Sequence, residues 1–251
     1  MKKHYKRKFI ASFFMTFSIA LPLLGTLSLG AQAQNKSIYT NKKNQVTFKP
    51  PKGDKPQHTV GGASRGEQCP LDARTSDLPI TPLIPTAAQA LTVKSHPTIL
   101  VYLPETSAEK AYFAMRDESE DYDYQTILPI SDNAGIVSLT LPKDAPDLSV
   151  DREYQWSLVL MCEGKLRPDS PITTGSIKRV ASTSDMARKL PEVNLFEDAA
   201  MFAQAGIWYD SVAALAQLKM TQPNDKLVSA NWQNLLATVG LEKVAKAEFV
   251  E

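Results

Sequence analysis

Seven short runs of residues between Ala90 and Val180 have the pattern of β-strands, and they constrain the fold more than any other feature of the sequence. Turn-forming stretches such as PETS, SDNAG and EGKLRPDS separate them, with no helical pattern between. Strands at this spacing predict an immunoglobulin-like β-sandwich, which we place at residues 61–183 together with a glycine- and proline-rich lead-in. The seven predicted strands are Ala90–Lys94, Pro97–Leu103, Lys110–Asp117, Tyr122–Leu128, Gly135–Leu141, Glu153–Glu163 and Thr173–Val180.

The run EYQWSLVLMCE, Glu153 to Glu163, is the clearest of these strands. Apolar residues and a cysteine alternate along it with a mixed polar and apolar set, and such alternation buries one face of a strand against an opposing sheet. Trp156 and Cys162 are therefore expected to face the core. The full inward set is Tyr154, Trp156, Leu158, Leu160 and Cys162.

Residues 1–33 have the composition of a signal peptide. Five basic residues precede an uncharged, mostly apolar run from Phe9 to Gly30, and the small residues of Ala31-Gln32-Ala33 follow. The alternative is an uncleaved membrane anchor, because the apolar run is long enough to span a bilayer. Pro22 and Gly25 within the run favour cleavage. The sequence therefore predicts export, to the periplasm or the cell surface.

Charge is unevenly distributed in the exported chain. Loss of residues 1–33 removes five positive charges and turns the net charge of +1 into −4. Residues 34–60 carry six lysines and one aspartate, so the remainder carries −9. Because this segment has few large apolar residues and several prolines, we expect a disordered basic arm that is dispensable for folding. Its charge also fits a weak contact with an anionic surface, whereas nothing else in the sequence indicates a nucleic-acid partner.

Cys69 and Cys162 are the two cysteines of the chain. In an oxidising compartment two cysteines favour a disulfide, here between the lead-in and the core face of a strand. The alternative is a buried free Cys162 and an inert Cys69. The neighbouring GGASRGE lacks the Gly-Lys-Ser/Thr ending of a phosphate-binding loop, so its glycines are expected to serve a turn.

Residues 193–249 change to helical periodicity, which predicts a short C-terminal helical hairpin region and an α+β, mainly β, fold. Gly206 and Gly240 lie 34 residues apart, the repeat length of tetratricopeptide hairpins, although Leu218 stands where that motif prefers alanine. The alternative is an ordinary helical tail packed on the sandwich. The aromatic and acidic residues within GIWYDS lie at a predicted helix start and are candidate anchors for a partner. These candidates are Trp208, Tyr209 and Asp210.

Six stretches resemble, in order, the cyanobacterial family called domain of unknown function 928. They are GGASRGEQC, HPTILVYLP, AGIVSLTLP, YQWSLVLMCE, GSIKRV and AGIWYDSVAALAQL. The resemblance covers roughly Val60 to Phe249. It implies an exported protein with a β-rich body and a helical end, and it implies no activity.

No residue set in the sequence indicates catalysis. Three histidines, His4, His58 and His96, leave no Ser-His-Asp set and no zinc-ligand spacing, so we expect no cofactor and no metal. The acids between Asp117 and Asp123 are expected to form a solvated hairpin tip rather than a calcium site. The sequence therefore favours a non-catalytic envelope module that docks a protein partner, with a helical-repeat protein as one candidate. The alternative is an exported hydrolase that uses carboxylates the sequence does not identify.

Overall fold

The computed structural model describes residues 45–51, 68–72, 78–119, 121–189 and 194–250. The chain divides into two units, Met1–Tyr39 and Thr40–Glu251, and every described residue belongs to the second unit. The predicted signal peptide and the glycines of GGASRGE lie outside the described residues. No helix in the described part of the chain is both long enough and apolar enough to cross a bilayer.

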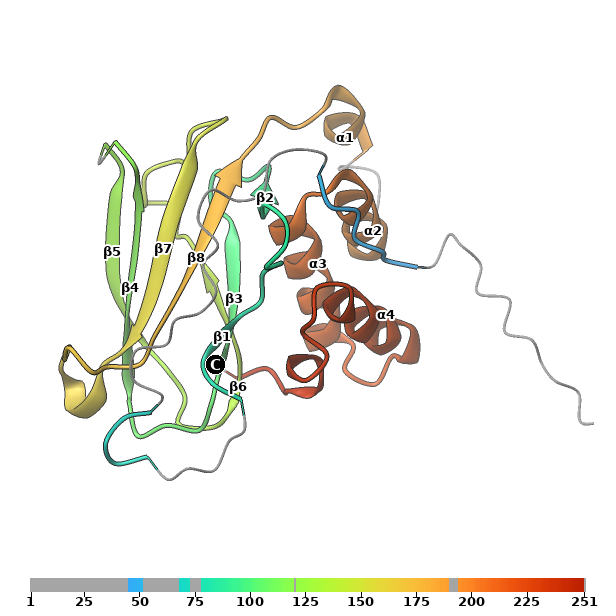
Figure 1. Ribbon diagram of the computed structural model, residues 1–251. Coiled ribbons are helices and arrows are strands. Elements are labelled where there is room, and N and C mark those ends of the chain that lie inside the picture. Colours follow the sequence, from blue (N-terminus) through green and yellow to red (C-terminus); the bar gives the residue numbers. More distant parts are fainter. Residues whose placement is uncertain (1–44, 52–67, 73–77, 120, 190–193, 251) are drawn as a thin grey trace, which may run out of the picture. The chain divides into compact units, whose positions relative to one another are not determined.

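Two β-sheets form the body of the protein, which confirms the predicted sandwich (Figure 1). One sheet has the order β1-β3-β6 and the other the order β2-β8-β7-β4-β5, and every neighbouring pair is antiparallel except β2 and β8. The strands of the first sheet are β1 (Thr81–Pro82), β3 (Thr98–Leu103) and β6 (Gly135–Thr140). Those of the second are β2 (Leu91–Thr92), β8 (Ile172–Arg179), β7 (Glu153–Leu160), β4 (Lys110–Asp117) and β5 (Asp123–Pro129).

Six of the predicted strands agree with observed ones to within three residues. The larger differences concern β1 and β2, each of which is an edge strand of its sheet. The run predicted at Ala90–Lys94 forms only the two residues of β2, paired in parallel with β8. The sequence pattern also missed β1, because its Pro82 lies in a proline-rich segment that predicts extended chain without pairing.

The predicted inward face of β7 is confirmed. Tyr154, Trp156, Leu158 and Leu160 are all buried, and the alternate residues of the strand are only half-buried. The Tyr154 hydroxyl accepts a hydrogen bond from the Ser149 backbone N–H at 2.7 Å, just upstream of the strand. A tyrosine bonded to the backbone before this strand is a recurrent feature of immunoglobulin-like sandwiches, and it fixes the corner at which the chain enters the second sheet.

The structure contains the Cys69–Cys162 disulfide, with both cysteines buried and their Cα atoms 5.4 Å apart. Cys162 lies just beyond β7, in a short 3-10 turn (η2, Cys162–Gly164), so the strand ends at Leu160, three residues before its predicted end at Glu163. The positive φ angles of Glu163 and Gly164 turn the chain there. On the other side, the Asp72 carboxylate accepts hydrogen bonds from the Cys69 N–H and the Ser107 N–H.

The C-terminal region is helical, as predicted. Asn194 caps the first helix of the predicted region through its side chain, and Gly206, with a φ of 78°, makes the turn into the next helix. Asp225 caps the last helix in the same way as Asn194. The helices are α1 (Ser184–Lys189), which was not predicted, α2 (Leu195–Ala205), α3 (Trp208–Thr221) and α4 (Lys226–Ala237), followed by the 3-10 turn η3 (Val244–Lys246).

The helical region does not continue as a further helical hairpin after α4. After α4 the chain forms η3 and then an extended segment in which Phe249 bridges Ile136 of β6 in parallel. Trp232 of α4 is buried, and its indole N–H donates to the Ala245 carbonyl at 3.2 Å, within this same segment. The tail thus ends by joining the sandwich.

The expectation of a disordered arm is wrong for residues 45–51. Val46 and Phe48 are buried, and the Phe48 ring meets the Trp208 ring edge-on, with centroids 4.9 Å apart. The Val46 N–H donates to the Asn231 side chain at 2.7 Å, and the Lys49 N–H donates to the Ala203 carbonyl at 3.0 Å. This segment is a structural part of the helical region, because two apolar side chains and its backbone bonds hold it there.

Candidate functional site

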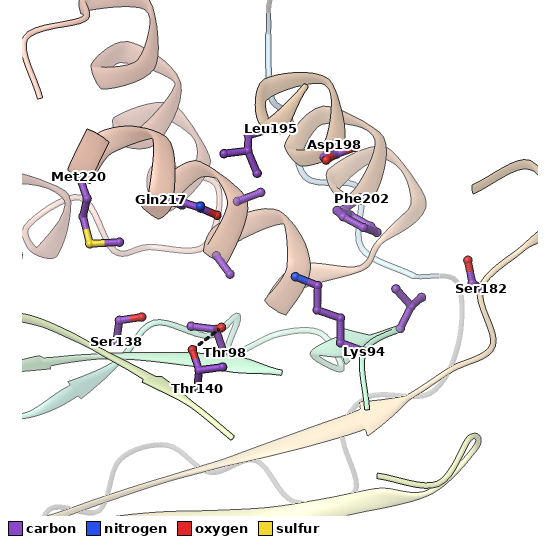
Figure 2. A pocket seen from close by; sticks show the side chains of 13 residues that line it. Lys94, Thr98, Ser138, Thr140, Ser182, Leu195, Asp198, Phe202, Gln217 and Met220 are labelled. Atoms are coloured by element: carbon purple, nitrogen blue, oxygen red, sulfur yellow. Dashed lines mark hydrogen bonds between the residues drawn. The ribbon is translucent and has the colours of Figure 1, made fainter. Parts of the chain in front are cut away.

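A groove of about 610 Å³ lies between helices α2 and α3 on one side and sheet one on the other (Figure 2). Clefts between structural layers are a common location for binding sites. Thr98, Ser138 and Thr140 lie on the strand side of the groove, and Gln217 and Met220 lie on the helix side. The full lining is Val93, Lys94, Thr98, Ser138, Thr140, Ser182, Leu195, Asp198, Phe202, Ala213, Ala214, Gln217 and Met220.

Two side chains of opposite charge, Lys94 and Asp198, line the groove. Figure 2 shows Lys94 pointing from the strand side toward the helices. Burial raises the pKa of the Asp198 carboxyl group, and the positive charge of Lys94 partly offsets this rise. One carboxylate oxygen of Asp198 is buried without a hydrogen-bond partner. The groove therefore offers a cation, hydroxyls and an unsatisfied acceptor beside apolar side chains, which suits a ligand with both polar and apolar groups.

A second, smaller cavity of about 290 Å³ opens between the two sheets, where β5 and β6 form their edges. Its lining is mainly apolar and includes the half-buried inward residues of β5, which no opposing strand covers completely. The two cavities share Ser138 and Thr140 of β6. The lining of the smaller cavity is Phe113, Tyr124, Thr126, Leu128, Ser138, Leu139, Thr140, Leu141 and Pro142.

The residues predicted to anchor a partner are instead part of the core. Trp208, Tyr209 and Asp210 are each at most 2% exposed, so the prediction that they face a partner is wrong. The Trp208 indole N–H donates to the Leu83 carbonyl at 2.7 Å, and the Tyr209 hydroxyl donates to the Ser176 carbonyl at 2.9 Å. The first turn of α3 therefore packs against the sandwich. Its rigid amphipathic side chains form an interface within the chain rather than one with a partner.

Asp210 fastens α3 to β2. One of its carboxylate oxygens accepts from the Thr92 hydroxyl at 2.7 Å and from the Val93 N–H at 3.1 Å, whereas the other has no partner. Burial raises the pKa of the Asp210 carboxyl group, and the bond from Thr92 and the charge of Lys94 offset only part of this rise. A buried carboxylate that lacks a full set of partners destabilises the fold at neutral pH.

We expect Asp210→Asn to be at least as stable as the wild type at pH 7. The asparagine oxygen can still accept from Thr92 and Val93, and no charge is buried. Because the pKa of Asp210 is higher in the folded chain than in the unfolded chain, the wild type gains stability relative to the variant as the pH falls toward the unfolded pKa, about 3.9. Thermal unfolding between pH 7 and pH 4 measures this difference. The exposed Asp144→Asn is the control, and a variant that loses more stability at pH 7 than at pH 4 would contradict the sign.

The acidic turn before β5 differs in part from the predicted solvated tip. Asp117 is buried, and its carboxylate accepts from the Tyr122 N–H at 3.1 Å and pairs with Arg152. Although burial opposes it, the hydrogen bonds from Tyr122, Ser119 and Arg152 hold the pKa of Asp117 below its usual value. No group of three or more His, Cys, Asp or Glu side chains within the described ranges is arranged to hold a metal ion. The ion pair between Asp117 and Arg152 therefore stabilises this turn.

His96 lies just before β3, where one ring nitrogen lies 3.0 Å from the Ala145 carbonyl and the other 3.3 Å from an Asp147 oxygen. No local sequence pattern indicates the groove. Lys94 follows β2 and Asp198 lies within α2, more than 100 residues along the chain, although both line the same cavity.

A protein-family model matches residues 60–249, and its description is Domain of Unknown Function (DUF928). This chain belongs to the DUF928 family. Among solved structures, the fn3 domain of the human collagen alpha-1(XX) chain is similar to this DUF928 protein at 17% identity, with a TM-score of 0.25. That match covers 36% of this chain and 76% of the fn3 domain. A comparison with curated proteins finds none that matches.

Proposed function

We propose that this DUF928 protein is an exported, non-catalytic binding module of the cell envelope that holds a protein partner in the groove between the sandwich and α2–α3. The observation that carries the proposal is the groove itself, an open cavity of about 610 Å³ whose lining combines Lys94 and Asp198 with apolar side chains. A partner would be bound there rather than through Trp208 and Tyr209, which the core already uses.

The proposed compartment is supported by the signal-like residues 1–33 and by the disulfide, which persists in oxidising surroundings. The proposed absence of catalysis is supported by the lining of the groove. Asp198 is the single carboxylate among its described lining residues, whereas glycoside hydrolysis uses two. The three tryptophans, whose rings are suited to stack on a sugar, are all buried.

The test compares capture of envelope proteins by the exported chain and by a variant with a filled groove. Ala213, a half-buried lining residue on α3, is changed to Trp so that the new ring occupies the cavity. The matched control is Leu166→Trp, an exposed position in the turn between β7 and β8. We expect a protein that is captured by the wild type and by the control and is lost from Ala213→Trp. Equal capture by all three would contradict the proposal.

The alternative is a hydrolase, and the observation in its favour is the raised pKa of Asp198, which suits a general acid. Its test is hydrolysis of envelope polysaccharide or peptide by the wild type and by Asp198→Asn. Turnover that Asp198→Asn abolishes would overturn the proposed binding role.

A further inference from the structure

The sheet edges of the described chain differ in how they are protected. An unprotected edge strand exposes unpaired N–H and C=O groups and invites another strand to pair, so proteins shorten, cover or charge such edges. Strands β1 and β2 have only two residues each, and α3 covers β2 through Asp210. Strand β5 carries the exposed Asp123 and ends in Pro129, which has no N–H to offer. Strand β6, GIVSLT, has neither a charge nor a proline.

Part of the outer edge of β6 already accepts an added strand. The Ile136 N–H donates to the Glu248 carbonyl at 2.8 Å, and the Val250 N–H donates to the Ile136 carbonyl at 3.0 Å. The C-terminal segment of the chain thus runs parallel to β6, and the Val250 side chain occupies the space that a Cβ at Gly135 would need. The chain itself shows that this edge binds an extended segment.

Beyond Ile136, no described residue pairs with this edge. The Leu141 N–H bonds to the Pro97 carbonyl, so odd-numbered residues of this strand pair with β3 and even-numbered residues point outward. Ser138 and Thr140 therefore present their backbone N–H and C=O groups at the outer edge, and both residues are exposed. No other described strand pairs with them.

We propose that an extended segment of the partner protein adds to β6 alongside Ser138 and Thr140, in line with the C-terminal segment. This inference rests on the proposed binding function and assigns its mode. Side chains of an added strand alternate between the two faces of the sheet. One set would enter the apolar cavity between the sheets, and the other would enter the groove below α2 and α3, because the two cavities meet at Ser138 and Thr140.

The two cavities define the chemistry of the segment. Phe113, Leu128 and Leu139 line the inner cavity and select apolar side chains. On the other face, Thr98 lies opposite Thr140 and shares a hydrogen bond of 2.8 Å with it. Lys94 adds a positive charge on the strand side of this groove, whereas the Asp198 carboxyl group belongs to α2 on the helix side. The partner segment is therefore extended, with apolar residues that alternate with polar or acidic ones. Backbone bonds provide affinity, and the alternate side chains provide selectivity, as in other strand-addition complexes.

The experiment uses fluorescein-labelled, end-capped short peptides in which valine alternates with glutamate, threonine or lysine, and measures their binding by fluorescence anisotropy. Ser138→Pro removes an outward N–H without breaking a bond to β3. The matched control is Ile127→Pro, which removes an outward N–H from the exposed edge of β5. Backbone N-methylation of the glutamate peptide at alternate residues removes the donors that would pair with β6, and this arm needs no change in the protein.

We expect the glutamate peptide to bind the wild type and Ile127→Pro equally, and to bind Ser138→Pro about fivefold more weakly or worse, because one hydrogen bond is lost and about 1 kcal/mol corresponds to about a fivefold change in Kd. The N-methylated peptide should weaken by a similar factor. Equal binding to Ser138→Pro, equal binding of the N-methylated peptide, or no saturable binding of any of the peptides would overturn the proposal. A wild-type dimer that Ser138→Pro dissociates would overturn it too, by assigning the edge to a second copy. If Ser138→Pro still captures the protein that Ala213→Trp loses, the binding function stands and strand addition fails.

Discussion

Deletion of residues 34–51 from a chain that begins at Gln34 should lower the free energy of unfolding by about 5 kcal/mol or more. Removing a buried phenylalanine side chain costs about 3–5 kcal/mol, and burial of a valine contributes about 1.5–3 kcal/mol. Both Phe48 and Val46 are lost with this segment, together with the backbone bonds to Asn231 and Ala203. Since a typical domain is stable by only 5–15 kcal/mol, the deletion brings the fold close to its limit. Urea denaturation followed by tryptophan fluorescence measures the loss.

Point variants separate packing from charge in this prediction. Phe48→Ala alone should cost about 3–5 kcal/mol, because it removes the edge-on contact with Trp208 and leaves a cavity beside α3. The neighbouring Lys49→Ala is the control, since its side chain is exposed and only its backbone bonds to α2, and it should stay within about 0.5 kcal/mol of the wild type. If the deletion leaves the urea midpoint unchanged, residues 34–51 do not contribute to stability and the arm is dispensable for folding.

The composition of residues 34–60 predicts disorder along the whole segment, although residues 45–51 are ordered in the structure. Six lysines and several prolines dominate the composition of residues 34–60, and such averages predict disorder. Within it, the short stretch VTF places Val46 and Phe48 on one face of an extended chain. Two apolar residues are too few to form a recognisable strand pattern, and their contacts with Trp208 and the helices come from far along the sequence.

The body of the fold was predictable because its signals are local. Alternation along Glu153–Glu163 fixed which residues face the core, and Gly206 marked a turn that requires positive φ. The disulfide was expected from the predicted compartment and the number of cysteines, and the structure contains it. Strand β2 was overestimated, because Lys94 and its neighbours continue an alternating pattern although the chain there turns away toward the groove.

The candidate site was not predictable for the opposite reason. Asp198 and Lys94 come together only because α2 packs over the sandwich. Trp208 and Tyr209 had the right chemistry for an interface, and the interface exists, but it lies within the chain. An amphipathic aromatic residue at a helix start therefore predicts a contact, but it does not predict whether that contact is with the same chain or with a partner.

Trp156→Ala should destabilise the protein by about 3–5 kcal/mol, as large-to-small substitutions in cores do. The indole is buried and lies stacked near Phe113, with ring centroids 6.4 Å apart. It also fills the space over Gly175 of β8, where any Cβ would overlap the ring. No smaller side chain fills this volume, so the loss of apolar burial is accompanied by a cavity between the sheets. Chemical denaturation at equilibrium measures the effect.

The second part of this prediction concerns the bond between sandwich and helix. The Trp156 indole N–H donates to the Tyr209 hydroxyl at 2.8 Å, and that hydroxyl donates to the Ser176 carbonyl. Tyr209→Phe should cost about 1–3 kcal/mol, because it leaves the buried indole N–H without an acceptor. Trp156→Phe keeps an aromatic ring but removes the donor. When both are made together, the total cost should be smaller than the sum of the two, since no buried indole donor is then stranded.

A double-mutant cycle with Trp156→Phe and Tyr209→Phe therefore reports whether α3 is bonded to the interior of the sandwich. A coupling of about 0.5–3 kcal/mol is expected for residues in direct contact. Additive costs would mean that the helix packs on the sheets without this bond, and wild-type stability of Trp156→Ala would mean that the indole is not in the core. Loss of this coupling would also affect the binding groove, because α3 forms its helical wall and is held to β7 and β8 through Tyr209. The packing of one tyrosine between the sheets thus links the stability of the fold to the geometry of the proposed site.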